Sequence, residues 1–272
     1  MDLEDLKFNF GCASCGYKNQ EPQTPLGSIP VGRIIEKLDQ LFAKNDMAEA
    51  GRLLDYWRKE AVSLRDKRGE LSMVSEQIGY FRKTGEKDKA LEAVDRALTL
   101  IGESPETVSF GTILLNAATT LKAFGKAEEA LPLYEMTYTI YSKHLKPEDA
   151  LFAGYYNNYG LALGDLGRFQ EAEDAYQKAL SIVLSQNRLD GAITYLNMAQ
   201  MYTFWDEKCA EDIKACLNSA QQILESPENE ENGYYAFVLS KCAPTFREFG
   251  KTQTAQKMQT LSEEIYARNG AM

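Results

Sequence analysis

Apolar residues recur along the chain as pairs of helical stripes, and a glycine or an asparagine separates the two stripes of each pair. The segment NNYGLALGDLGRFQEAEDAYQKALSIV, residues 157–183, shows the pattern on both sides of Gly167. Apolar side chains at intervals of three and four residues lie on one face of an α-helix. Glycine readily adopts the left-handed conformation that ends a helix, and asparagine tolerates it. Each such unit is therefore predicted to be a hairpin of two helices.

The unit occurs six times, and a second feature supports the hairpin. In the clear copies an alanine follows the turn residue by five positions, and a large residue such as Tyr176 follows that alanine by four. The methyl group lets the two helices approach closely, and the large side chain fills the remaining space. The final copy departs from the pattern, with Gln259 and Ser262 where an apolar and a small residue are expected. A polar last helix suits a terminal cap, whose outer side faces water.

The repeated unit resembles the tetratricopeptide repeat over about residues 31–268, and its length of about 40–42 residues is similar to that of kinesin light chain repeats. The resemblance implies an all-α fold, a right-handed α-solenoid of about six helical hairpins. It also implies a concave groove, lined by the first helix of each unit, that holds a peptide or a helix of another protein. The units are expected to start near residues 31, 71, 111, 153, 192 and 236, in a superhelix covering 31–272 whose last unit is a degenerate cap. Residues 1–30 contain three of the eight prolines and are predicted to form a separate tail or strap.

Composition narrows the classes of partner. The chain has 272 residues, 44% of them hydrophobic, and a net charge of −10. The lysines and arginines are not clustered, and the net charge is negative. Both features argue against binding to nucleic acids and to anionic membrane surfaces. We find no apolar run long enough to span a bilayer. Five scattered cysteines do not form a disulfide framework, so a cytoplasmic location is predicted.

Asparagines mark the predicted groove. Asn116, Asn158 and Asn197 each stand two residues before the small residue of the first helix, and Asn157 precedes the second of them. An amide offers both a donor and an acceptor, so a row of amides could hold a peptide backbone whatever its side chains. In related peptide-binding arrays, asparagines at this place contact ligand backbone. The alternative is that the amides bond to neighbouring helices and hold the stack, and the sequence leaves both open.

Polar and basic residues are predicted beside these asparagines on the inner face. They are Thr119, Lys122, Arg82, Lys83, Gln200, Lys241 and Arg247. A groove with several cations would favour an acidic segment or a carboxylate terminus. The alternative is that these residues are solvated helix ends.

Metal binding and catalysis are not predicted. Cys12 and Cys15 are spaced like half of a zinc site, but such a site needs four ligands and no second pair follows. An incomplete zinc knuckle, inert thiols and a metal shared between chains remain open. His144 is the single histidine, and no phosphate loop or nucleophile motif is present, so no enzyme activity and no cofactor are expected.

The sequence thus predicts a non-catalytic module that binds a protein or peptide in its groove. Two other functions stay open. One is an intracellular receptor for signalling peptides, and the other is a structural module that associates with itself as a homo-oligomer.

Overall fold

The computed structural model describes residues 25–43, 46–102, 107–208 and 210–270, and within these ranges it contains twelve α-helices and no strand. The predicted all-α solenoid is confirmed. The first helices of the successive hairpins are α1 (Val31–Ala43), α3 (Lys67–Thr84), α5 (Val108–Ala123), α7 (Ala150–Asp165), α9 (Arg188–Tyr202) and α11 (Gly233–Glu248). The second helices are α2 (Met47–Ser63), α4 (Lys87–Ile101), α6 (Ala127–His144), α8 (Phe169–Gln186), α10 (Ala210–Leu224) and α12 (Thr252–Gly270).

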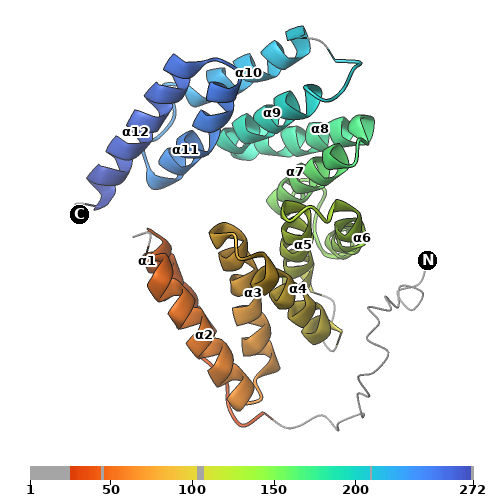
Figure 1. Cartoon of the computed structure of the whole chain (residues 1–272), viewed down its shortest axis with the longest axis vertical. Coiled ribbons are helices and arrows are strands. Elements are labelled where there is room, and N and C mark those ends of the chain that lie inside the picture. Colours follow the sequence, from red (N-terminus) through yellow and green to blue (C-terminus); the bar gives the residue numbers. More distant parts are fainter. Residues whose placement is uncertain (1–24, 44–45, 103–106, 209, 271–272) are drawn as a thin grey trace.

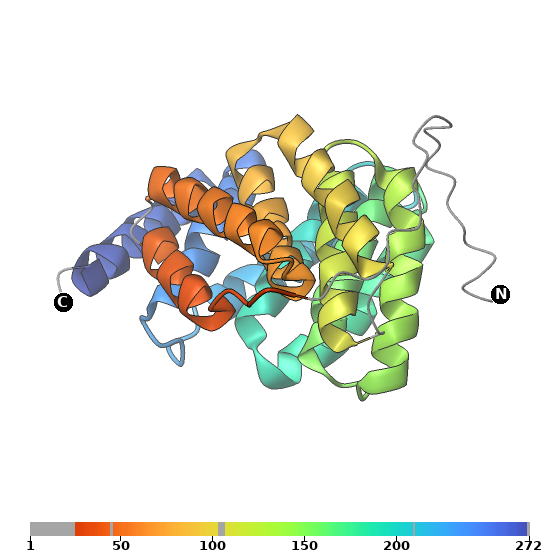
Figure 2. The same ribbon diagram turned by 90° about the horizontal axis from the view of Figure 1, so that it is seen from below.

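The hairpins stack in chain order into a curved array. Helices α3, α5, α7 and α9 each pack against the second helix of the preceding hairpin, and successive first helices also touch one another. Figure 1 shows the curve, and Figure 2 gives the view from below. In both views the terminal hairpins, α1–α2 and α11–α12, lie on the same side of the molecule.

Four turns within hairpins end on a left-handed glycine, as the repeat predicts. Gly85, Gly125, Gly167 and Gly250 have φ between 71° and 79°. A Cβ atom would strain this conformation, so glycine fits the position that stops the first helix and redirects the chain. Asn45, the corresponding residue of the first unit, lies outside the described residues.

The helices of a hairpin approach closely where a small residue faces a large one. A Cβ atom on Gly111 would lie 2.7 Å from Cε1 of Tyr141, which is fully buried. The positions 42 residues later hold Ala153 and Val183, both buried. Alanine is larger than the glycine of the third hairpin, and valine is smaller than its tyrosine. The pair thus differs between units, and Ala153 and Val183 both line a small cavity where the third hairpin has the tyrosine ring.

Ser262 fits the cap without disturbing this packing. Its side chain is buried, and its Oγ donates a hydrogen bond to the carbonyl oxygen of Ala236 at 2.7 Å. Thr137 makes the same kind of bond in the third hairpin, from Oγ1 to the carbonyl oxygen of Gly111 at 3.3 Å. The polar residue is thus satisfied by the facing first helix.

A polar seam divides the hydrophobic core between the first hairpin and the rest. One cluster joins Ile29 and the apolar residues of α1 and α2 to Met73, and the other runs from Val74 to Ile265. At the seam Gln77 is 1% exposed. Its Nε2 donates to Oδ1 of Asp55 at 2.9 Å, and its Oε1 accepts from Nη1 of Arg58 at 3.4 Å.

Residues 25–30, the described end of the predicted strap, pack against the connection between α2 and α3. The amide of Leu26 donates to the carbonyl oxygen of Leu64 at 2.8 Å, and that of Ile29 donates to Oδ2 of Asp66 at 2.9 Å. Ile29 is buried. The remainder of the predicted segment 1–30, up to residue 24, lies outside the described residues. Among the helices that the structure describes, none has the length and apolar character needed to cross a membrane.

Candidate functional site

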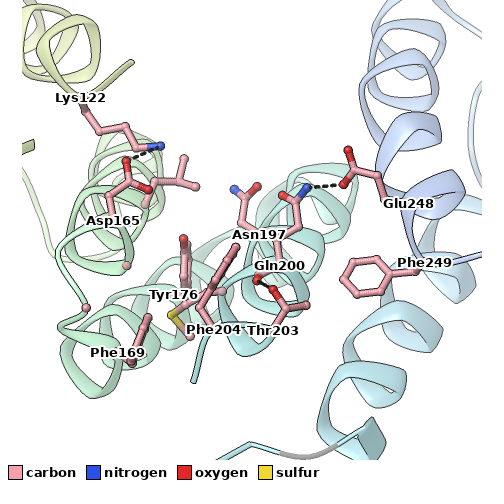
Figure 3. A pocket seen from close by; sticks show the side chains of 14 residues that line it. Lys122, Asp165, Phe169, Tyr176, Asn197, Gln200, Thr203, Phe204, Glu248 and Phe249 are labelled. Atoms are coloured by element: carbon pink, nitrogen blue, oxygen red, sulfur yellow. Dashed lines mark hydrogen bonds and ion pairs between the residues drawn. The ribbon is translucent and has the colours of Figure 1, made fainter. Parts of the chain in front are cut away.

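A cavity of about 770 Å³ opens among the C-terminal parts of α5, α7, α9 and α11 and the start of α8. Figure 3 shows the side chains that line it. First helices supply most of the wall, as expected for the inner face of such an array. This volume lies within the range of about 300–1,000 Å³ that is usual for ligand pockets.

The walls of the cavity are mainly apolar. They include Leu161, Phe169, Met201, Phe204 and Phe249. Phe204 is 75% exposed, the highest value among the exposed large hydrophobic residues of the described chain. An exposed aromatic ring beside a concave apolar wall is typical of a ligand-binding surface.

Polar groups at the rim pair with one another across helices. Nζ of Lys122 on α5 lies 3.2 Å from Oδ2 of Asp165 on α7. Nε2 of Gln200 on α9 donates to Oε2 of Glu248 on α11 at 3.0 Å. Both contacts are visible in Figure 3. The cavity lining thus carries one ammonium and two carboxylates.

Tyr176 contributes a hydroxyl to the floor of the cavity. Its side chain is 1% exposed, and in Figure 3 the phenol oxygen points into the cavity. Among the described residues none forms a hydrogen bond with this hydroxyl. Burial, with a smaller contribution from the Asp165 carboxylate, raises the pKa of the phenol, so it stays neutral and can donate. A donor that faces a cavity without a protein partner indicates a position for a ligand acceptor.

The predicted asparagines have different surroundings. Asn197 lines the cavity, and its Nδ2 donates to Oδ1 of Asn157 at 3.0 Å. Nδ2 of Asn158 donates instead to the carbonyl oxygen of Gly154 in its own helix at 2.8 Å. Asn116 is half-buried and is not among the residues that line the cavity.

The predicted basic residues do not converge on the cavity. Of them, Lys122 alone lines it, together with the predicted Gln200. Nη1 of Arg82 donates to Oγ1 of Thr120 at 3.1 Å and so links α3 to α5, and burial lowers the pKa of this guanidinium. Nζ of Lys83 lies 5.5 Å from the centroid of the Phe42 ring.

The other three predicted residues lie apart from the cavity too. Nζ of Lys241 lies 5.7 Å from the centroid of the Phe237 ring, and Arg247 is exposed near the end of α11. Oγ1 of Thr119 donates to the carbonyl oxygen of Leu115 at 2.8 Å, within its own helix.

Sequence reasoning missed several wall residues. Thr203 and Phe204 belong to the turn between α9 and α10, which is longer than the other turns within hairpins. The next residue, Trp205, stacks on Phe169 with 5.9 Å between ring centroids and so fixes this turn against α8. The extended fifth turn, with three aromatic residues in YTFW, was the signal that could have identified this wall.

No group of metal-ligating side chains is found within the described residues. Cys12, Cys15 and Cys209 lie outside them. Cys216 and Cys242 are buried free thiols. Burial raises the pKa of Cys216 to about 11 and that of Cys242 to about 12, so neither is a reactive thiolate at neutral pH.

The comparisons with known proteins agree on the fold. A family model described as Tetratricopeptide repeat matches residues 153–183, which cover most of α7 and α8. Among solved structures, BtubC (BKLC) from P. vanneervenii is 18% identical, with a TM-score of 0.53 over 85% of this chain and 93% of that chain. At this identity the likeness shows the fold alone.

Two further solved structures are more distant. One is a Podosopora anserina protein described as a kinesin light chain, whose TPR-like repeats are nearly identical to one another. It is 18% identical to this chain, with a TM-score of 0.48 over 74% of this chain and 97% of that chain. A tetratricopeptide repeat protein from Parabacteroides merdae is 18% identical, with a TM-score of 0.42 over 86% and 98% of the two chains. No curated protein matches the chain. The predicted resemblance to the tetratricopeptide repeat is confirmed by the family model.

Proposed function

Because the chain is an α-solenoid containing a tetratricopeptide repeat, we propose that it is a non-catalytic interaction module that binds a peptide segment of a partner protein in the cavity between α5 and α11. The observation that carries the proposal is the cavity itself, which combines an exposed aromatic wall with a hydroxyl donor that has no partner among the described residues. Apolar walls with a few convergent polar groups are typical of binding sites.

Three side chains have distinct roles in this proposal. Phe204 supplies apolar contact to a ligand side chain, since most of its ring is exposed. The Tyr176 hydroxyl donates to a ligand acceptor. The Asn197 amide contacts ligand backbone, as the sequence predicts, and it is already held in place by its bond to Asn157.

The acidic or carboxylate-terminated partner predicted from the basic residues stays a prediction. Lys122 is the cation available for it in the cavity, and its ammonium is already paired with Asp165. A ligand carboxylate would therefore have to displace the Asp165 side chain from Lys122. The new ion pair with the ligand would replace the existing one, so the number of ion pairs would not increase.

The test uses a library of random dodecapeptides displayed on phage, selected against the full chain, with affinities of the selected peptides measured by isothermal titration calorimetry. Phe204→Ala is expected to weaken binding at least about tenfold, as is usual when an aromatic contact at the centre of an interface is truncated. Asn197→Ala is expected to weaken it less.

The matched control is Tyr56→Ala, which removes another exposed aromatic ring, on α2 and away from the cavity. It should leave binding unchanged. If the library yields no binder, or if Phe204→Ala binds like the wild type while its thermal unfolding is also unchanged, the proposal is wrong.

A further inference from the structure

A second, smaller cavity of about 230 Å³ lies at the opposite ends of α7 and α9. Its lining includes Ala150, Gly154 and Asn157 of α7, and Asp190 and Ile193 of α9. The end of α8 closes it from behind through Val183 and Gln186. The larger cavity uses the same two helices further along.

The two cavities lie along one stripe of residues on α7 and one stripe on α9, and this pair of stripes is called the furrow below. On α7 the lining residues of both cavities follow one another at helical spacing, at positions 150, 154, 157, 161 and 165. On α9 the corresponding positions are 190, 193, 197 and 200. Residues at these intervals lie on one face of a helix, so each helix presents one continuous stripe to the furrow.

The bonded pair Asn157–Asn197 stands between the two cavities. Asn157 lines the smaller cavity and Asn197 lines the larger. Their mutual bond uses Nδ2 of Asn197 and Oδ1 of Asn157. Nδ2 of Asn157 and Oδ1 of Asn197 form no hydrogen bond within the described part of the chain. The middle of the furrow thus offers one donor and one acceptor. They can pair with the carbonyl oxygen and the amide of a peptide backbone that crosses the furrow there.

The charges along the furrow are mostly negative. Asp190 in the smaller cavity accepts hydrogen bonds from the Tyr234 hydroxyl and from Nδ2 of Asn187, the latter at 3.1 Å. In the described ranges no lysine or arginine forms an ion pair with it. With Asp165 and Glu248, three carboxylates line the two cavities against the single ammonium of Lys122. This pattern is complementary to a basic ligand.

The separation of the cavities sets a length. The midpoints of their lining residues are about ten positions apart on α7 and about seven on α9, or about 11–15 Å at 1.5 Å per residue. An extended peptide advances about 3.3 Å per residue, so this distance corresponds to three to five residues. The Tyr176 hydroxyl, which has no hydrogen-bond partner among the described residues, adds a donor for backbone at the larger cavity.

We propose that the furrow binds an extended peptide that places a basic side chain in the smaller cavity and a bulky apolar side chain in the larger one, three to five residues away. The peptide backbone crosses the Asn157–Asn197 pair between them. This inference rests on the proposed function and adds the spacing and the sign of charge of the ligand. It reverses the acidic ligand that the sequence predicts.

The test uses synthetic dodecapeptides of glycine and serine that carry one lysine and one phenylalanine, separated by one to eight positions and made in both orders. Affinity for the full chain is measured by fluorescence anisotropy. The optimum is expected at separations of three to five, with binding about tenfold tighter than at one or eight. Peptides with glutamate in place of lysine are expected to bind more weakly at every separation.

Protein variants assign the two anchors. Asp190→Asn keeps an acceptor for Tyr234 and is expected to remove the gain from lysine without weakening the peptide that carries phenylalanine alone. The matched control Asp88→Asn, at an exposed position of α4, should change nothing.

The outcomes separate the two proposals. If affinity depends on Phe204 but not on the lysine, its spacing or Asp190, the binding function stands and the two-anchor furrow is wrong. The same holds if glutamate peptides bind better than lysine peptides. If none of the synthetic peptides binds while the random library yields binders, the two-anchor furrow is wrong and the binding function stands; if the library also yields none, both proposals are overturned.

Discussion

Replacing Gly111 by alanine is expected to destabilise the array, because Tyr141 occupies the space that the new methyl group needs. A Cβ atom at this position would lie 2.7 and 3.0 Å from two ring carbons of Tyr141 and 3.3 Å from Cγ2 of Ile140. Both partners are buried in the core, so neither can swing into solvent. Phe152, 5.7 Å from the Tyr141 ring between centroids, further limits movement of the ring.

The expected magnitude is the sum of two opposing effects. Overpacking a core position costs about 1–3 kcal/mol of unfolding free energy. Alanine in a helix interior favours folding by about 1 kcal/mol relative to glycine. Gly111→Ala should therefore lose up to about 2 kcal/mol. The control Gly79→Ala, in the middle of α3 with no heavy atom within 4 Å of the new Cβ, should gain about 1 kcal/mol.

A double-mutant cycle with Tyr141→Val isolates the clash. This substitution copies the pair Ala153 and Val183 of the next hairpin. It also removes the Tyr141 hydroxyl, 3.0 Å from Oγ1 of Thr112, but that loss is common to both arms of the cycle. In the Tyr141→Val background, Gly111→Ala is expected to be stabilising, with a coupling energy of about 1–3 kcal/mol.

The assay is urea unfolding followed by far-UV circular dichroism, with the slope of the transition compared among the four proteins because repeat arrays can unfold in parts. If Gly111→Ala stabilises the wild type as much as Gly79→Ala does, the packing argument is refuted. A coupling energy near zero would refute it as well, because the ring and the new methyl group would then not compete for space.

Two further perturbations probe polar groups, one half-buried and one buried. Burial, with a smaller contribution from the Asp39 carboxylate, raises the pKa of Glu76 above its ordinary value of 4.5, so its ionisation weakens the folded state as pH rises through that range. Glu76→Gln should therefore raise the unfolding free energy at pH 7 and lose that gain in acid, and a gain independent of pH would contradict the assignment. Ser262→Ala should cost about 1 kcal/mol by removing the donor to the Ala236 carbonyl, whereas Ser262→Thr, which keeps the hydroxyl as Thr137 does, should cost less in the same urea titration.

The helices and their turns could be predicted from the sequence because they depend on local spacing. Gly85, Gly125, Gly167 and Gly250 have the left-handed φ that the repeat predicts, and each stands at the end of a first helix. Such positions are determined by residues a few places away in the chain, so one sequence is enough to find them.

The cavity could not be predicted in the same way because its parts come from distant units. Lys122 and Asp165 meet only through the curvature that brings α5 beside α7, and Gln200 meets Glu248 through the contact of α9 with α11. Arg82 shows the opposite case. Its charge predicted a position in the ligand groove, whereas its guanidinium donates a hydrogen bond to α5, the next first helix. A helix surface read from sequence does not distinguish a partner in the protein from a partner in solution.

The Gln77 seam has a consequence for how the molecule loses order. The buried apolar residues on its N-terminal side form a cluster separate from the longer one that begins at Val74, so the two are expected to behave as separate cooperative units. Amide protons of α1 and α2 should exchange with solvent before those of α7 and α9. Fraying from that end would leave the larger cavity intact, because its lining begins only at Lys122.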